Sequence, residues 1–486
     1  MGPFEHSHTG PAFANDYERV TAAGENEQIT DLDFLQSVID PTLLPPLHTL
    51  SSKQISYLAI GIAAHYIANR KQDIDVTNGY AKLQTDFYGL VVSGRSRAAV
   101  NSKSRSRKYW RHKIQYEADI SRLNFEAAQR IVGGSLPDAE IYASNTTLQK
   151  IREKKAAIEK YLSGKAIVDT RSGKKILLSK LACQASVNRF NELYWISKNF
   201  EAIASSRNMG WLFVTYTAPP EYHPNPLKGK CSYDPDLGVK ASHLYILSAW
   251  ARIRSLLNKW GIKSGIDTYF GIRTAETHKD GSVHWHLLVF AASDITQCFI
   301  DASAEHFPHH GQMKVEVGDP KIGSASSYIF KYLAKGFDRS VTQIDGSTMD
   351  AEADESREQS DLASIRNGER VRAALKTMRV RQYQPFGVNN VLTLVRFINK
   401  LGEDDFSAHA SELAITVKTE IWRHPQGLKY LLEHPELFIK YNGTAPLMII
   451  REETTTVYGE KSSKPIGLKI GDHLIHTQGR FSMEKA

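Results

Sequence analysis

The chain has 486 residues, 41% of them hydrophobic and 10% aromatic, which is the composition of a soluble globular protein of about two or three domains. Its longest apolar stretch, Tyr57 to Ala68, contains Gly61 and His65 and falls short of the roughly 18 residues that a membrane span needs, so no membrane association is expected. The N-terminus has no export signal and the three cysteines form no CxxC pair, which argues against a disulfide framework or a thiolate zinc site and predicts a cytoplasmic protein.

The first part of the chain divides into a polar segment and a helical region. Residues 1–50 are mostly polar and end near Pro41, Pro45 and Pro46, so we expect them to be disordered. Residues 51–205 show apolar residues at helical spacing, as in Ile151, Ile158 and Leu162, and no strand-like alternation. They predict a mostly helical domain with a possible role in DNA binding.

A basic run lies within this helical region. The formal net charge of +8 is compatible with a polyanionic partner, and the distribution of the charge is more informative than its sum. Residues 90–115 contain no acidic residue but many lysines and arginines, and either a phosphate-contacting arm or a solvated basic loop fits this pattern equally well. The candidate DNA contacts here are Arg105, Arg107 and Lys108.

The centre of the chain predicts alternating strands and helices. Short aromatic and β-branched runs indicate strands, helical spacing with a glycine stop indicates helices, and Asp280-Gly281 indicates a tight hairpin. This order favours an α+β fold with a ferredoxin-like (RRM-like), four-stranded antiparallel sheet in residues 206–340, helices against one face and a site open on the other. The expected elements are strands 211–217, 266–275, 283–290 and 313–317 and helices 242–261, 295–304 and 324–335.

Two regions follow the predicted sheet. Between Asp345 and Asp361 there are seven carboxylates and one arginine, which predicts a flexible acidic insertion over residues 341–370. Residues 371–486 predict a small α+β region, with a helix near Gly427 to Lys440 and hairpin-like strands from Met448 onward. The sequence does not indicate a function for this last region.

A metal site is predicted in the hairpin of the central sheet. Side chains alternate along a strand, so His284 and His286 point to the same face and can share a cation. The hairpin turn brings Glu276 alongside as a third ligand, which leaves coordination positions for water and a phosphate oxygen. His278 and Asp280 lie in the same hairpin and are alternative third ligands.

A pair of tyrosines is predicted on one face of the last central helix. Tyr328 and Tyr332 are four residues apart, which places their side chains roughly 6 Å from each other on a helix. Lys331 and Lys335 lie in the same two turns and supply positive charge. A phenol has a pKa near 10, so a nucleophilic tyrosine needs a stabilised anion and an electrophilic phosphorus, which lysines and a metal ion can provide.

These motifs together resemble a known family. HWHLLVF (284–290) followed by YIFKYLAK (328–335) resembles the HUH and YxxxY motifs of rolling-circle replication initiators. FVTYTAPPEYHP, YILSAWARIRSLL, GIRTAETHKDGSVHWHLLVF and RQYQPFG, which follow one another in that order along the chain, are similar to segments of the phage replication gene A endonuclease family. The resemblance covers roughly residues 105–400 and implies an HUH endonuclease domain at residues 206–340.

The resemblance implies a Mg²⁺- or Mn²⁺-dependent nickase. In such an enzyme His284 and His286, with Glu276, hold the metal, and Tyr328 and Tyr332 act in turn as nucleophiles. One tyrosine leaves a 5′-phosphotyrosine and a 3′-hydroxyl primer, and the second allows the released strand to be rejoined as a circle. The implied partners are single-stranded or supercoiled origin DNA and a host helicase and polymerase. No GxxxxGK[ST] motif occurs, so no nucleotide cofactor is expected, and Arg381 is a further candidate DNA contact.

Three alternatives use the same residues. A two-tyrosine transposase would share the chemistry and differ in its products. A histidine-triad nucleotide hydrolase would need a third histidine where Leu288 stands, and a DNA-binding protein with a decayed site would not retain both phenols and both imidazoles. A second histidine cluster, at His306, His309 and His310, lies in a loop-like setting with Pro308 and Gly311 and is interpreted as solvated.

Overall fold

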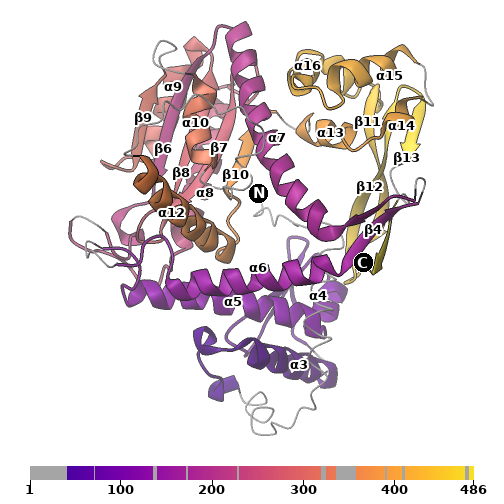
Figure 1. Cartoon of the computed structure of the whole chain (residues 1–486). Coiled ribbons are helices and arrows are strands. Elements are labelled where there is room, and N and C mark those ends of the chain that lie inside the picture. Colours follow the sequence, from indigo (N-terminus) through magenta and orange to yellow (C-terminus); the bar gives the residue numbers. More distant parts are fainter. Residues whose placement is uncertain are drawn as a thin grey trace.

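Figure 1 shows the computed structural model, which describes the chain from residue 41 onward. The predictions for residues 1–40, for Lys335 and for residues 336–356 lie outside the described residues. No helix in the described part is long and apolar enough to cross a membrane. The described residues are 41–486 without 70–71, 135–138, 171–172, 227–228, 319–323, 335–356, 389–390, 408–410, 477–480 and 486, and only the backbone is described for 330–334 and 357–366.

A five-stranded antiparallel sheet forms the centre of the molecule, in the order β10-β7-β8-β6-β9. An α+β chain with antiparallel sheets is therefore confirmed, and four of these strands and the helices between them follow the predicted order. The fifth strand, β10, comes from the segment after the tyrosine helix and was not expected to be a strand. The elements are β6 (Gly210–Thr217), α8 (Ala241–Lys259), β7 (Tyr269–Thr277), β8 (Val283–Ala291), α9 (Ser293–His306), β9 (Met313–Val317), α10 (Ala325–Ala334) and β10 (Tyr383–Phe386).

The hairpin between β7 and β8 forms as the sequence predicted. Gly281 has a φ of 86°, a left-handed conformation that favours glycine, and the turn closes with a hydrogen bond from the amide of His278 to the carbonyl of Ser282 at 2.7 Å. β7 begins three residues later than predicted, because the amide of Thr268 bonds to the carbonyl of Gly265 in a turn. The turn fixes the register in which Glu276 pairs with His284.

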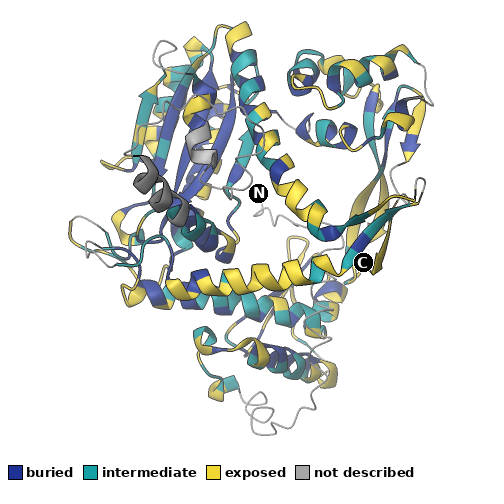
Figure 2. Cartoon of the chain, in the orientation of Figure 1, coloured by how far each residue is buried: buried dark blue, intermediate teal, exposed yellow. Residues whose placement is uncertain are grey.

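Both faces of the central sheet are covered by helices. One face packs against α8, α9 and α12 (Arg357–Thr377), and the other packs against α7 (Leu178–Ser206), α10 and α13 (Val391–Ile398). Every residue of β7 and β8 is consequently buried, and Figure 2 shows this burial concentrated in the strands of the sheet. The prediction that one face of the sheet is open was wrong, because α7 packs Leu193, Phe200 and Ile203 against that face.

The N-terminal part has a core of its own around Phe87 and Trp110. It contains a three-stranded sheet, β1-β2-β3, that the prediction of a mostly helical region did not include. The missed signal is Asn78-Gly79, both at positive φ, which forms the hairpin between β1 and β2. The elements are η1 (Pro41–Leu43), η2 (Leu47–Thr49), α3 (Ser52–Ala68), β1 (Asp75–Thr77), β2 (Tyr80–Gln84), β3 (Val91–Gly94), α4 (Arg97–Ser104), α5 (Arg107–Ala128) and α6 (Asn145–Ser163).

The C-terminal part packs against α7 with its helices, and two of its strand elements reach other parts of the chain. β14 (Phe481–Lys485) pairs with β4 (Lys165–Asp169), which also pairs with β5 (Lys175–Leu177). The tip of the β11–β12 hairpin reaches the N-terminal part, where Glu460 lies 3.2 Å from the ammonium of Lys103. The remaining elements are η3 (Pro220–Tyr222), α14 (Glu403–Ser407), α15 (Glu412–Thr416), the π-helix η4 (Val417–Ile421), α16 (Gly427–Glu433), η5 (Pro435–Leu437), β11 (Leu447–Thr455), β12 (Lys461–Ile470) and β13 (His473–His476).

Two sequence-based boundaries differ from the structure. α12 starts at Arg357, inside the segment predicted to be a flexible acidic insertion, so residues 357–370 are helical. The helix predicted near Gly427 to Lys440 ends at Glu433, because Pro435 cannot continue it and a short 3-10 turn follows.

Candidate active site

The candidate site is built on rows of paired residues that share one face of the central sheet. In an antiparallel sheet, residues paired across neighbouring strands point to the same side. One row runs from Tyr383 through Thr274, His286 and Thr215 to Lys314. The adjacent row pairs Glu276 with His284, so both imidazoles and the carboxylate emerge on the same face.

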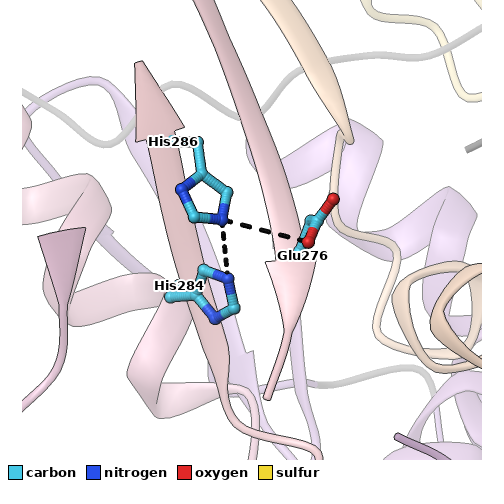
Figure 3. A group of neighbouring side chains, drawn as sticks. All are labelled: Glu276, His284 and His286. Atoms are coloured by element: carbon cyan, nitrogen blue, oxygen red, sulfur yellow. Dashed lines mark hydrogen bonds and ion pairs between the residues drawn. The ribbon is translucent and has the colours of Figure 1, made fainter. Parts of the chain in front are cut away.

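The three predicted ligands converge in the structure (Figure 3). The Nε2 atoms of His284 and His286 are 2.9 Å apart, and Nε2 of His286 is 3.9 Å from Oε2 of Glu276. All three side chains are buried, with exposed fractions of 7 to 9%. The possible ligand atoms of these three residues all lie within 4.8 Å of one another, and among the described residues no other group of three or more His, Cys, Asp or Glu side chains converges in this way.

The donor set suits a divalent cation. Thr215 places its hydroxyl 2.9 Å from Nδ1 of His286, so a proton on Nδ1 leaves the lone pair of Nε2 directed at the cluster. Two imidazole nitrogens facing each other at 2.9 Å need a proton or a cation between them, and the nearby carboxylate favours a positive charge. Two neutral nitrogens and one carboxylate oxygen leave further coordination positions for water or substrate oxygens.

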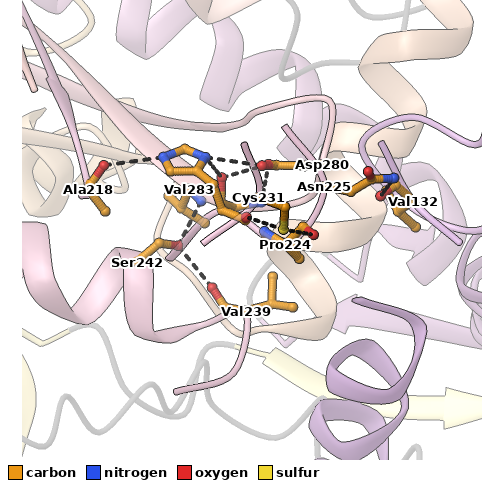
Figure 4. A network of polar contacts seen from close by, with 11 residues as sticks. Val132, Ala218, Pro224, Asn225, Cys231, Val239, Ser242, Asp280 and Val283 are labelled. Atoms are coloured by element: carbon orange, nitrogen blue, oxygen red, sulfur yellow. Dashed lines mark hydrogen bonds and ion pairs between the residues drawn. The ribbon is translucent and has the colours of Figure 1, made fainter. Parts of the chain in front are cut away.

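Asp280, one alternative third ligand, is held by the turn instead. One of its oxygens accepts hydrogen bonds from the amide and hydroxyl of Ser282 at 3.0 and 2.6 Å, and the other is 3.0 Å from Nδ1 of His223. Nε2 of His223 is in turn 3.2 Å from the carbonyl of Ala218. The network, shown in Figure 4, ties the hairpin to the segment after β6 and occupies both oxygens of Asp280, which is not among the convergent donors of Glu276, His284 and His286.

The charges of His223 and Asp280 support each other. Burial alone would lower the pKa of His223, but the hydrogen bond and the charge of Asp280 raise it above its ordinary value. Burial would likewise raise the pKa of Asp280, while the bond and charge of His223 and the hydroxyl of Ser282 lower it. Both ring nitrogens of His223 therefore face protein acceptors, which is the arrangement of a structural ion pair.

His278, the other alternative, packs against a ligand. Its ring centre is 4.0 Å from that of His284, and burial lowers its pKa to about 4, so it is neutral at physiological pH. Its nitrogens are not among the convergent donor atoms. In this geometry Glu276 is the third member of the cluster.

Tyr328 lies at the edge of the same face. Its side chain is 39% exposed, and its ring meets the ring of Phe213 edge-on at 4.7 Å. Phe213 stacks on the ring of His286 at 5.5 Å, so a single aromatic ring separates the tyrosine from the histidine cluster. The phenol hydroxyl donates a hydrogen bond to Oε2 of Glu316 on β9.

The structure describes the other predicted helix residues less fully. Tyr332 lies on α10, four residues after Tyr328, as predicted, but its side chain and that of Lys331 are outside the described residues. Lys335 is outside them altogether. The predictions for these three residues therefore stay predictions.

Sequence reasoning did not single out three residues of this face. Thr215 pairs with His286 across the sheet, and Glu316 accepts a hydrogen bond from the hydroxyl of Tyr328. Burial raises the pKa of Tyr383, and the charge of the nearby Glu276 raises the pKa of Tyr383 further. Thr215 could be found from the sequence only with the register of β6 against β8. Glu316 and Tyr383 depend on long-range pairing that no local pattern encodes.

The predicted DNA contacts fall in two places. Arg381 precedes β10, is partly buried, and donates from Nε to the carbonyl of Tyr383 at 3.2 Å. Arg105, Arg107 and Lys108 lie where α4 ends and α5 begins, on the N-terminal core rather than on the central sheet (Figure 1).

Two other sequence features are also placed by the structure. Leu288, where a histidine triad would need its third histidine, is fully buried in the apolar core between the sheet and α7. His309 and His310 are exposed, and with His306 they do not form one of the convergent groups found among the described residues.

Comparison with known proteins gives the family. The sequence profile of the bacteriophage replication gene A protein (GPA) matches residues 100–340, which include the histidine pair and the tyrosine pair. Residues 100–340 belong to the bacteriophage replication gene A protein family. The family predicted from the motifs is thereby confirmed.

Several curated members and relatives of this family are similar to the chain. It is 28% identical over 326 residues to the replication protein of Haemophilus phage HP1 and 28% identical over 263 residues to the replication gene A protein of Escherichia phage 186. It is 29% identical over 218 residues to a probable replication endonuclease from a prophage-like region of Escherichia coli O6:H1.

These alignments cover 63%, 51% and 41% of this chain, and only 39%, 36% and 24% of the respective relatives. The chain thus spans well under two thirds of the length of these relatives. No solved structure is significantly similar to the chain.

Proposed function

We propose that the chain is a site-specific DNA endonuclease and strand transferase that nicks a replication origin for rolling-circle replication. The observation that carries the proposal is the convergence of Tyr328 and the cluster of Glu276, His284 and His286 on one sheet face, with only the ring of Phe213 between them. Family membership and relatives named as replication proteins and a replication endonuclease support it.

The order of the central strands supports an HUH endonuclease domain. β6, α8, β7, β8, α9 and β9 follow one another as in the split βαβ pattern of ferredoxin-like sheets, and the sheet adds β10 at one edge. The histidines then lie on a central strand, and the tyrosine helix α10 follows the last strand of the pattern. This arrangement holds the ligands on rigid strands and the nucleophile on a helix above them.

The donor set would hold Mg²⁺ or Mn²⁺ through His284, His286 and Glu276. A bound divalent cation would withdraw electron density from a phosphate oxygen and make the phosphorus more electrophilic. The chain's own residues position the reacting groups. Thr215 orients the ring of His286, and the ring of Phe213 lies between the phenol of Tyr328 and the imidazole of His286. Lys331 and Lys335, four residues apart in sequence, would add positive charge beside the attacking oxygen.

Two tyrosines allow the strand to be rejoined. The phenol oxygen of one tyrosine attacks the scissile phosphorus, the bond to the 3′ oxygen breaks, and a 5′-phosphotyrosine and a 3′-hydroxyl primer result. After one round of synthesis the second tyrosine cleaves the regenerated origin, and the released 3′-hydroxyl attacks the first phosphotyrosine to close a circle. Tyr328 and Tyr332 would take these two roles.

DNA would contact the chain at two surfaces. Arg381 lies beside the metal hairpin, since the amide of Ala275 bonds to the carbonyl of the next residue, Gln382, at 2.8 Å. Arg105, Arg107 and Lys108 would bind phosphates on the N-terminal part. A host helicase would open the origin and a host polymerase would extend the primer, which places the reaction in the cytoplasm of a bacterial host.

The experiment is detection of the covalent adduct. The full chain is incubated with Mn²⁺ and labelled single-stranded oligonucleotides that tile a candidate origin, and protein-linked 5′ product is sought on denaturing gels. We expect the adduct with the unmodified chain, its loss when Tyr328 and Tyr332 are both replaced by phenylalanine, and residual cleavage with either single change. An adduct formed at the normal rate by the double variant would refute the assignment.

A further inference from the structure

Glu316 is a carboxylate at the edge of the central sheet that accepts a hydrogen bond from the candidate nucleophile Tyr328. It stands on β9, where it pairs in register with Phe213 of β6 and so points to the face that carries the histidine cluster. Its Oε2 accepts a hydrogen bond from the hydroxyl of Tyr328, which comes from a different element, α10. Family membership and the motifs assign no role to this residue.

The surroundings keep Glu316 an anion. Its other carboxylate oxygen pairs with the ammonium of Lys314, two residues earlier on the same strand. The hydrogen bond from Lys314, followed by that from Tyr328, lowers the pKa of Glu316. The groups that bond to the carboxylate are therefore two donors, the ammonium of Lys314 and the hydroxyl of Tyr328.

The position also suits access by a substrate. Tyr328 is 39% exposed, so the phenol lies at the surface beside the buried cluster rather than within the core. The phenol directs its proton at Glu316, while the ring stays in contact with Phe213 and with Trp211 at 5.9 Å. The oxygen is thus oriented by a ring contact on one side and by a proton acceptor on the other.

We propose that Glu316 is a catalytic residue that accepts the phenolic proton when Tyr328 attacks the scissile phosphate. This inference rests on the proposed function. As the bond between the phenol oxygen and phosphorus forms and the bond to the 3′ oxygen breaks, the proton passes from Tyr328 to the carboxylate of Glu316, and the leaving 3′ oxygen takes a proton from solvent water. Glu316 then releases this proton to water, since its lowered pKa keeps it an anion. In the rejoining step the 3′-hydroxyl loses its proton to water and attacks the phosphotyrosine, and the departing phenol oxygen takes up a proton from solvent.

General-base assistance fits the acidity of the groups involved. A phenol with a pKa near 10 is almost fully protonated at neutral pH, so direct attack by phenolate is slow. A positioned carboxylate takes the proton as the oxygen becomes part of a phosphate ester and loses its basicity. The contribution of such a base is typically at least about 100-fold in rate.

The experiment uses single-tyrosine forms of the full chain. In the Tyr332→Phe background only Tyr328 can cleave, and in the Tyr328→Phe background only Tyr332 can. Glu316→Gln is introduced into each, and the rate of adduct formation with Mn²⁺ and an origin oligonucleotide is measured from pH 6 to pH 10. Glu305→Gln, on the exposed side of α9, is the matched control.

We expect Glu316→Gln to slow adduct formation by Tyr328 about 100-fold at pH 7 and to leave adduct formation by Tyr332 and the control variant unchanged. The deficit should shrink toward pH 10, because a phenolate needs no acceptor, and Glu316→Asp should recover part of the rate. A purely structural role would give a loss that is independent of pH and equal in both backgrounds.

Three results would overturn the inference: equal rates for Tyr328 with and without Glu316→Gln, an equal loss in both backgrounds, or no adduct from the Tyr332→Phe form. An adduct that survives replacement of both tyrosines would instead contradict the proposed function itself. The two failures are therefore distinguishable in one set of measurements.

Discussion

Two clusters of histidine and carboxylate lie at the β7–β8 hairpin, one of them with His223 from the segment after β6, and they differ in where their polar atoms point. His223, Asp280 and Ser282 are closed on themselves: both ring nitrogens of His223 and both oxygens of Asp280 have protein partners. In the other cluster, the Nε2 atoms of His284 and His286 face each other beside Glu276. The first arrangement stabilises a turn, whereas the second presents lone pairs to a shared point.

The comparison separates a histidine held by protein partners from two histidines whose nitrogens face each other, without reference to any relative. Burial does not separate them, since Asp280 and Glu276 are 4 and 7% exposed. The pKa of His223 is raised by an ion pair inside the protein, and that charge has a fixed partner. In the other cluster a carboxylate and two imidazoles converge, and we propose that a cation completes this geometry. Each prediction below changes one cluster and is compared with the other cluster, with a matched control variant or with the unmodified chain.

The largest effect is expected from His286→Ala. Loss of one imidazole removes cation binding and with it several kcal/mol of stabilisation at the phosphate, which corresponds to about a thousandfold in cleavage rate. The measurement is the initial rate of covalent adduct formation with Mn²⁺. His223→Gln should retain most of the rate at 20 °C as long as it stays folded, and equal losses in the two variants would remove the distinction between the clusters.

Asp280→Asn should lower the stability of the fold rather than the rate of cleavage. It breaks a buried ion pair and leaves His223 without its anion, which we expect to lower the free energy of unfolding by about 3 kcal/mol. Urea unfolding followed by tryptophan fluorescence measures the change. The matched control is Asp267→Asn, since Asp267 pairs with Arg207 while 86% exposed and should contribute less than about 1 kcal/mol. Similar midpoints for the two variants would contradict a structural role for Asp280.

Thr215→Val should weaken cation binding with little change in stability. Valine keeps the shape of threonine but cannot hold Nδ1 of His286, and loss of such a partner typically lowers metal affinity about 10- to 100-fold. Isothermal titration with Mn²⁺ gives the affinity. Thr215→Ser retains the hydroxyl and should bind nearly as the parent does. A serine variant as weak as the valine variant would point to packing instead of the hydrogen bond.

The smallest effect is a pH dependence confined to the turn cluster. The pKa of Asp280 is lowered on folding, so its contribution is present above the unfolded value and is lost as the pH falls. The pKa of His223 is raised, so its contribution is complete below the unfolded value near 6.5 and is lost as the pH rises. The stability difference between the unmodified chain and His223→Gln should thus be largest near pH 5 to 6 and smaller at pH 9. A difference that grows toward pH 9 would reverse the assigned charges.

Local patterns predicted the hairpin, the alternation along the strand and the shared face of the two histidines. Asp280-Gly281 forms the turn, and the period of two along β8 places His284 and His286 on one face, so these features needed only neighbouring residues. Features that depend on contacts between residues far apart in the sequence were not predicted. β10 joins the sheet from more than 100 residues after β7, and α7 covers a face that the order of strands alone leaves open.

The choice between Glu276, His278 and Asp280 shows the limit of sequence reasoning most clearly. All three residues lie in one hairpin and all can bind a cation. Asp280 is withdrawn from the cluster by His223, which is 57 residues away in sequence, and His278 stacks on His284 without joining the convergent atoms. Only the three-dimensional contacts distinguish the convergent carboxylate from the other two candidates.

The most direct test of the account is a count of Mn²⁺ ions bound by the full chain, measured from the loss of the free-ion signal in electron paramagnetic resonance. The account predicts one site in the unmodified chain and in His223→Gln, and its loss in His286→Ala and Glu276→Gln. Undiminished binding when both His286 and Glu276 are replaced would show that the facing imidazoles and their carboxylate do not hold the cation, and the proposed chemistry would lose its basis.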